Sequence, residues 1–268
     1  MGSLTDFALR EEYKRVAKLG DKLSEIEPLI DWDAFRPIVI DLFCNKTEKG
    51  GRPNIDEVVM IKMLVLQEWH GLSDPELERQ VADRISFRRF LGFSKVIPDY
   101  STVWFFRERL IESGKDRAIW NELQRQLDSM GLCVKHDIIQ DATFITSDPG
   151  HAKADKPRGD ESKTRRSRDG TWAKKGNKSF FGCVPKGYDA TMKRSVRGHP
   201  LSIRDKLRNK RISKKRAPGE RPYAVIKNVF KSGHVRVTTV ARVHVKMIFA
   251  AFSFNLHQLL TLKKQGMV

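Results

Sequence analysis

Apolar positions in the first half of the chain recur at the three- and four-residue spacing of amphipathic helices. Thr5 and Asp33 can each cap the start of a helix. The run from Ile55 to Trp69 predicts a helix whose apolar face is wide enough to be well buried. The sequence Ser-Asp-Pro-Glu at 73–76 combines a capping side chain with an early proline and two acids, so another helix starts there. Residues 1–130 are therefore predicted to be all-helical.

Two short helical segments follow this start, and a longer helix begins near Ser101, which can cap it. On that longer helix, Arg107 and Arg109 are expected to be exposed cations. Tryptophans in this half of the chain are expected in the core rather than at a ligand site: Trp69, Trp104 and Trp120. The succession of short helices resembles a helix-turn-helix, but the turn spacing is loose and plain helical bundles show the same pattern.

A strand-like run, 136–148, follows the helical half and carries a carboxylate, Asp141, among isoleucines and a phenylalanine. A lone buried carboxylate is costly, so Asp141 pairs with a cation, faces water at a strand edge, or holds a metal. Residues 150–182 are poor in apolar side chains and rich in Lys, Arg, Gly and Ser, which predicts a mobile basic loop. Trp172 in this loop can stack on a base or pin the loop to the protein body.

The last third returns to apolar periodicity. The Pro-Gly-Glu-Arg-Pro sequence of 218–222 leads into a helix, and Glu220 is expected at the start of this helix. Residues 235–240 predict a strand, and 243–262 a largely apolar, buried helix. With helices first and strands mixed with helices afterwards, the fold class is α+β, with a helical domain at 1–130 and a second domain at 131–262.

Charge changes the picture more than the other properties of composition do. The 268 residues carry a net charge of +18, and the surplus lies in one block: 151–231 holds 25 Lys and Arg against 7 Asp and Glu. Such an asymmetry indicates a polyanionic partner, most plausibly nucleic acid. Three widely spaced cysteines without zinc-site spacing favour a reduced, cytoplasmic protein. The sequence shows no signal-peptide pattern at its start and no apolar run of membrane-spanning length, so no membrane partner is expected.

Several stretches together resemble the InsH-like branch of the DDE transposases of prokaryotic insertion sequences. The helical stretches at 72–80, 83–92 and 98–104 look like that branch's N-terminal domain, and Asp141-Ala142-Thr143 looks like its first acidic motif. The stretch from Arg208 through Arg216, Glu220 and Lys227 looks like its C-terminal signature. The tyrosine that many relatives place three before the Arg is Ser213 here. The resemblance implies that the second domain is ribonuclease-H-like.

The family reaction cuts DNA at terminal inverted repeats and transfers the strand, a phosphoryl transfer steadied by two divalent metal ions. By resemblance, Asp141 and Glu220 are catalytic residues and ligands for Mg²⁺ or Mn²⁺, whose preferred ligands are oxygens. Double-stranded DNA is then the partner, and a homodimer remains an open arrangement. The residues expected to contact DNA are cationic or aromatic: Lys227, Arg216, Arg208, Lys210, Arg211, Arg165, Arg166 and Trp172.

The second Asp of the triad has no good counterpart. In relatives a strand-rich stretch bearing it would stand between Gly182 and Cys183, and Asp189 is a poor substitute because no strand pattern precedes it. The sequence therefore predicts an internal deletion, a truncated ribonuclease-H-like domain and catalysis that is absent or very weak. Four alternatives remain: a site completed by another acid or a partner chain, a non-catalytic DNA-binding regulator that interferes with an intact relative, an RNA-binding protein, and a relic that scarcely folds.

Overall fold

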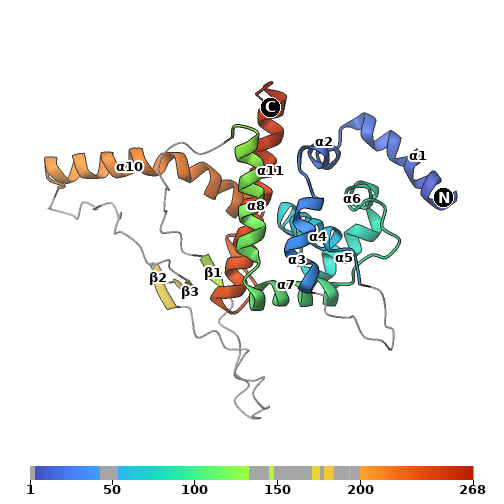
Figure 1. Ribbon diagram of the computed structural model, residues 1–268. Coiled ribbons are helices and arrows are strands. Elements are labelled where there is room, and N and C mark those ends of the chain that lie inside the picture. The colour runs from blue at the N-terminus through green and yellow to red at the C-terminus, as the bar shows by residue number, and fades with distance from the viewer. Residues whose placement is uncertain are drawn as a thin grey trace, which may run out of the picture. The chain divides into compact units, whose positions relative to one another are not determined.

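Two groups of residues make up the computed structural model, which describes 4–42, 54–132, 145–147, 171–175, 178–183, 193 and 200–267. The first unit comprises 1–133 together with 244–268, and the second comprises 134–243. We call them the helical unit and the basic unit. Figure 1 shows the described part of the helical unit as helices, whereas the basic unit combines short strands with the long helix α10.

The helical unit follows the helical pattern of the sequence closely. Its elements are α1 (Leu4–Leu19), α2 (Lys22–Ile26), η1 (Glu27–Leu29), η2 (Asp33–Phe35), α3 (Arg36–Val39), η3 (Ile40–Leu42), α4 (Glu57–His70), α5 (Asp74–Asp83), α6 (Ile85–Phe90), α7 (Tyr100–Ser113), α8 (Asp116–Ser129) and most of α11 (Val240–Lys264). The predicted helix starts at 5, 33, 55 and 73 each lie within two residues of an observed one. The cap of α7 differs, because the Asp99 carboxylate, not Ser101, accepts the hydrogen bond from the Thr102 amide, at 2.6 Å.

Helix α4 lies at the centre of the helical unit. All twelve residues from Val58 to Trp69 are buried, so the helix is covered on every side. An aromatic cluster extends this core, with Trp32 5.4 Å from Phe90 and 6.1 Å from Phe252 between ring centroids. Phe252 belongs to α11, which the chain adds more than a hundred residues after α8. The far C-terminal helix thus completes the core of the N-terminal helices.

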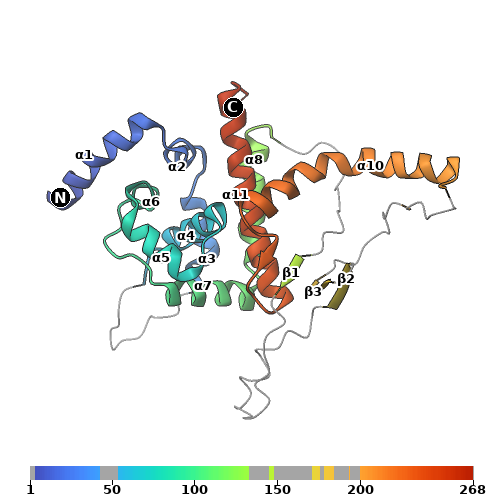
Figure 2. The same ribbon diagram turned by 180° about the vertical axis from the view of Figure 1, so that it is seen from behind.

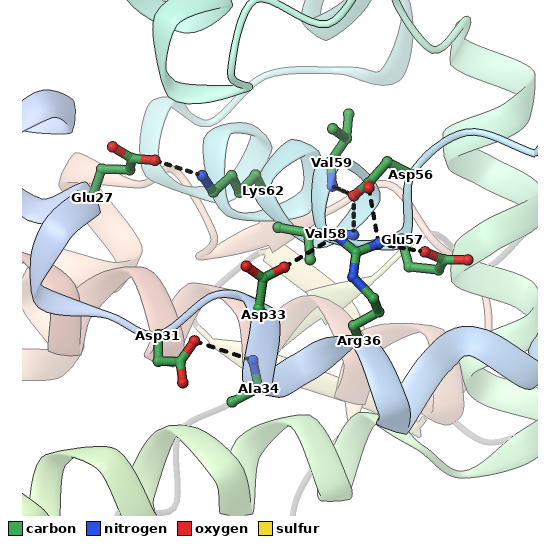
Figure 3. Close-up of polar contacts among 10 residues, drawn as sticks. All are labelled: Glu27, Asp31, Asp33, Ala34, Arg36, Asp56, Glu57, Val58, Val59 and Lys62. Atoms are coloured by element: carbon green, nitrogen blue, oxygen red, sulfur yellow. Dashed lines mark hydrogen bonds and ion pairs between the residues drawn. The ribbon is translucent and has the colours of Figure 1, made fainter.

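The start of α4 is held by a cluster of charged side chains (Figure 3). Asp56 caps the helix by accepting hydrogen bonds from the amides of Val58 and Val59, at 2.9 and 3.2 Å. Its other carboxylate oxygen accepts from Arg36 at 2.8 Å, and Arg36 also pairs with Glu57 at 2.9 Å. The hydrogen bond to Asp56 raises the pKa of Arg36, so the guanidinium stays charged. This cluster joins α3 to the start of α4.

A buried ion pair contradicts the expectation that Arg107 is exposed. Its side chain is 5% exposed and donates to Asp74 at 2.7 Å and to Gln67 at 3.0 Å. Gln67 in turn donates to Asp74, which closes the triangle. Burial of Asp74 opposes ionisation, but the charge of Arg107 and these hydrogen bonds together lower the pKa of the carboxyl below its usual range. The cation is buried here because two partners, Gln67 of α4 and Asp74 of α5, converge on this α7 side chain.

Trp104 was expected in the core but is 40% exposed. Its neighbours Tyr100 and Phe105 are also exposed, at 54% and 56%. Trp69 is buried as expected, and Trp120 is half-buried.

Among the described helices, α11 is long and apolar enough by length and composition to cross a membrane. Its phenylalanines Phe249 and Phe252 instead lie in the aromatic core, as in the central helix of a globular domain.

The described strands of the basic unit form one mixed sheet in the order β2-β3-β1-β4. Its elements are β1 (Ile145–Ser147), β2 (Thr171–Lys175), β3 (Lys178–Cys183), α10 (Ile203–Ala224), η4 (Val225–Val229, a π-helix) and β4 (His234–Val235). β3 runs antiparallel to β2 and to β1, whereas β4 runs parallel to β1. Thr146 lies opposite Gly182 on one side and His234 on the other. A parallel pair needs a long crossover, and here the chain between β1 and β4 contains β2, β3 and α10.

Two expectations for this region need correction. The basic stretch 150–182 is not a loop throughout, because 171–175 and 178–183 pair as antiparallel strands with Trp172 opposite Phe181. The predicted strand at 235–240 shrinks to His234–Val235, since α11 begins at Val240. The first error came from composition, because an antiparallel hairpin needs few apolar residues when one of its faces is solvated.

Removing one partner of the buried Arg107 pair should destabilise the helical unit strongly. We expect Arg107→Met to lower the free energy of unfolding by about 3–5 kcal/mol, because Asp74 would keep its charge without its cation. The measurement is urea unfolding followed by circular dichroism. Arg125→Met is the matched control, since this exposed arginine pairs with Glu122 on the surface of α8 and its loss should cost about 1 kcal/mol or less. Equal effects of the two changes would contradict the proposed importance of burial.

Acid should weaken the helical unit through His70, which packs against Phe87 with 4.8 Å between ring centroids. Burial, and next the charge of Arg84, lowers the pKa of His70 to about 4 from 6.5. Between pH 6.5 and about 4, His70 therefore takes up a proton in the unfolded chain but stays neutral in the folded unit. The free energy of unfolding falls as the pH is lowered through this window. We expect His70→Gln to flatten the fall in the urea midpoint over this range. His234→Gln, which removes an exposed imidazole from the basic unit, should leave the fall unchanged.

Candidate nucleic-acid interface

The strongest concentration of described cations lies on α10, whose N-terminus is closed by a reciprocal cap. The Ser202 hydroxyl accepts from the Asp205 amide at 3.1 Å and donates to the Asp205 carboxylate at 2.8 Å. Lys193 pairs with the same carboxylate at 2.7 Å, and its backbone exchanges two hydrogen bonds with Asn209. The hydrogen bond from Lys193, and next that from Ser202, lowers the pKa of Asp205. The helix therefore starts at a fixed point, with its acidic residue already paired.

Beyond that cap the helix is almost purely cationic. Of residues 203–216, eight are Lys or Arg and one is acidic. The exposed cations among those whose side chains are described are Arg204, Lys206, Lys210, Arg211 and Lys214, and Arg208 is half-buried. Figure 2 shows α10 as one long helix, so these cationic positions follow one another along a single element. A row of cations on a helix can neutralise successive phosphates of a nucleic-acid backbone.

The C-terminal half of α10 departs from the expected helix boundary. The helix continues through Pro218 and Pro222, so Glu220 lies inside it rather than at a helix start. The fixed φ of proline fits a helix, and each ring removes one hydrogen bond, which is why prolines usually mark a boundary. The backbones of Arg216 and Glu220 therefore belong to the same helix as the cations, whereas their side chains lie outside the described part of the structure.

Lys227 lies one step further, in the π-helix η4, and is half-buried. The chain turns back immediately after it: the Ser232 amide donates to the Ile226 carbonyl at 3.0 Å, and Lys231 adopts a positive φ of 55°. This turn brings Gly233 against the lysine, so that a Cβ there would lie 3.3 Å from the Lys227 Cβ. The close approach favours glycine, because a Cβ at this position would push the Lys227 side chain away by a few tenths of an ångström.

Charge separates the two units completely. The helical unit holds 23 Lys and Arg and 23 Asp and Glu, whereas the basic unit holds 28 Lys and Arg against 10 Asp and Glu. The entire surplus of +18 therefore belongs to the basic unit. Attraction of a polyanion is a property of this unit alone, and the helical unit adds no net long-range pull.

The remaining predicted site residues stay untested. Asp141, Arg165 and Arg166 lie outside the described residues, and Trp172 is described only as a backbone position in β2. Among the described residues there is no cluster of three or more His, Cys, Asp or Glu side chains that could hold a metal ion. The structure thus groups Arg208, Lys210 and Arg211 on one helix. Sequence reasoning treated 204–216 as cation-rich but missed the contact of Lys193 with Asp205, which joins residues twelve apart.

Two family models match the chain. The model described as Transposase domain (DUF772) matches residues 10–109, and the model described as Transposase DDE domain matches residues 112–256. The second match covers more than half of the chain and includes all described elements of the basic unit. No solved structure shows a significant match to the chain.

Replacing α10 cations should weaken nucleic-acid binding in a salt-dependent way. For Lys210→Gln/Arg211→Gln/Lys214→Gln we expect the slope of log Kobs against log salt on duplex DNA to become shallower by up to about 2.7, if each residue neutralises one phosphate. Fluorescence anisotropy over a salt series gives this slope. The matched control, Lys14→Gln/Arg79→Gln/Arg125→Gln, removes three exposed cations of the helical unit and should leave the slope unchanged. A slope that is the same in both triple variants would exclude α10 from the interface.

Proposed function

The chain belongs to the DDE transposases of insertion sequences, and from that premise we propose that it binds duplex DNA at insertion-sequence ends but is catalytically defective. Such enzymes act on DNA in the transposition of mobile elements, and the family depends on a divalent metal ion. The observation that carries the proposal is the cation-rich helix α10 within the matched DDE region. A row of cations along one helix needs no metal to attract a phosphate backbone.

For the metal, we propose Asp141 and Glu220 as the ligands that this chain retains. Carboxylate oxygens suit Mg²⁺ or Mn²⁺, and such ions supply stabilisation of the attacking and leaving oxygens of phosphoryl transfer. Glu220 is supported by its sequence position, four residues after Arg216 and seven before Lys227 in one helical stretch. Two carboxylates are fewer than the three that the family reaction uses, which is the reason to propose absent or very weak catalysis.

We propose that the chain descends from the InsH-like branch through an internal deletion between Gly182 and Cys183, and that 131–262 is a truncated ribonuclease-H-like domain after a helical domain at 1–130. The small size of the described sheet agrees with missing strands. β3 runs from Lys178 to Cys183 across the proposed junction, so a deletion there would have left a continuous strand. A copy of the element with an extra segment at this point would support the deletion.

The proposed partner is double-stranded DNA at terminal inverted repeats, bound by α10 and Lys227 together with Arg165, Arg166, Arg216 and Trp172. We propose a cytoplasmic protein that acts as a homodimer, because two element ends must be brought together.

A non-catalytic regulator is the second candidate. It is favoured by the same α10 surface, since a protein that binds the ends without cutting them would exclude an intact relative. Stronger binding to single-stranded RNA than to duplex DNA would favour the RNA-binding alternative.

Incubation of the protein with inverted-repeat duplex DNA and Mn²⁺ tests catalysis. We expect a salt-dependent gel shift without strand nicking, because the metal site lacks one carboxylate. Asp141→Ala is the matched variant and should shift the same DNA with little change. Nicking that Asp141→Ala abolishes would overturn the catalytic defect, and absence of any gel shift at low salt would overturn DNA binding itself.

A further inference from the structure

The first half of α10 has one half-buried face and one exposed face. The half-buried residues follow one another at steps of one, three and four, as on one side of a helix: Asp205, Arg208, Asn209 and Ile212. This face also carries the one acid between residues 203 and 214, and its carboxylate accepts hydrogen bonds from Lys193 and Ser202. The exposed face therefore holds no acidic side chain that would repel an anionic partner.

Two aliphatic side chains lie along the middle of this exposed face. Ile203 is 78% exposed and Leu207 is 52% exposed, and they stand about one turn apart. At 3.6 residues per turn, exposed cations fall on both sides of the aliphatic pair. Those on one side are Lys206 and Lys210, and those on the other are Arg204 and Arg211.

The start of α10 is held in place, so these side chains do not lie on a fraying end. The Lys193 amide donates to the Asn209 side chain at 3.0 Å, and the Asn209 amide group donates back to the Lys193 carbonyl at 2.8 Å. Together with the Ser202 cap, these contacts order the turn that carries Ile203. A partner that binds this face therefore loses little affinity to ordering of the helix.

An aliphatic line flanked by cations matches the cross-section of a DNA major groove. The groove is about 12 Å wide and admits a helix whose diameter with side chains is about 10–12 Å. Phosphates line both of its walls, and base edges form its floor. Among the groups that the bases present there, the thymine C5-methyl is the apolar one. The cations of α10 would face the two walls, and the aliphatic pair would face the floor.

The same face fits an anionic membrane surface less well. A helix that lies in a membrane interface buries an apolar face along its length. On α10 this apolar face ends at Leu207, because Lys210 and Lys214 continue the same side of the helix. The short aliphatic stretch and the cations on both of its sides therefore favour a nucleic-acid groove.

We propose that Ile203 and Leu207 contact thymine methyl groups in the major groove and so make DNA binding by α10 sequence-dependent. This inference rests on the proposed function, because it requires that α10 binds duplex DNA. The flanking cations contact phosphates, which are the same in every sequence, and therefore supply affinity. The aliphatic pair supplies discrimination, since it gains buried apolar area against thymine that it does not gain against cytosine or uracil.

Replacing thymine by uracil tests the contact, because it removes the methyl group and keeps base pairing and phosphates. The probe is the duplex that the wild-type protein selects from a random-sequence pool, synthesised once with thymidine and once with deoxyuridine. Fluorescence anisotropy at about 150 mM salt, near the physiological ionic strength, gives both dissociation constants. We expect wild type to bind the uracil duplex about fourfold more weakly for each contacted methyl group, the factor that corresponds to one buried CH₂.

Ile203→Ala/Leu207→Ala should bind the thymine and uracil duplexes equally, with the affinity that wild type has for the uracil duplex. Alanine keeps the helix, and no cation is lost, so the salt dependence of binding should stay that of wild type. The matched control is Val229→Ala, which shortens another exposed apolar side chain of the basic unit, 60% exposed. This control should retain the full preference for thymine.

The possible results separate this inference from the proposed function. Equal binding of both duplexes by wild type would overturn the methyl contact and leave DNA binding intact. A preference for thymine that persists in Ile203→Ala/Leu207→Ala would also overturn it, because other residues would then read the methyl groups. Absence of binding to either duplex at low salt would refute the proposed function, and the inference with it. Tighter binding to phosphatidylglycerol vesicles than to the duplex, lost in the double variant, would make a membrane the partner of this face.

Discussion

Buried charge on α4 is the constraint on which the helical unit depends. A helix covered on all sides can carry the buried polar residues Lys62, Gln67 and Glu68 only if each has a hydrogen-bond or ion-pair partner. Those partners come from different elements: Glu27 of η1 for Lys62, at 3.1 Å; Asp74 of α5 and Arg107 of α7 for Gln67; and Lys246 of α11 for Glu68, at 2.6 Å. Apolar packing alone would tolerate sliding of these helices along α4. The polar contacts fix their register.

The helices themselves could be predicted from sequence because their signals are local. Caps and three- and four-residue periodicity operate within one or two turns, and they placed α4, α5 and α11 correctly. Arg107 shows the limit of this reasoning. Its position, one turn after Val103 and just before Leu110, already put it on the buried face of α7, but its charge argued for solvent. Burial was decided by Asp74 and Gln67, which lie far away in sequence and close in space.

The basic unit was less predictable because its structure depends on distant pairing. Thr146 pairs with His234, and no local signal in either stretch specifies the other. The proposed ligands Asp141 and Glu220 stay sequence expectations, because Asp141 and the side chain of Glu220 lie outside the described residues. The prolines of α10 gave a misleading helix boundary. Each removes one backbone hydrogen bond, but the helix continues through Pro218 and Pro222 despite these losses.

The division of charge between the units links structure to function. A neutral helical unit has its acids matched internally, as in the Arg36 cluster and the Lys246–Glu68 pair, and can fold without a polyanion. The basic unit carries +18 and repels itself, so its compact state is stabilised by any partner that supplies negative charge. DNA phosphates supply such charge at high density, which is why the division of charge favours the proposed DNA partner.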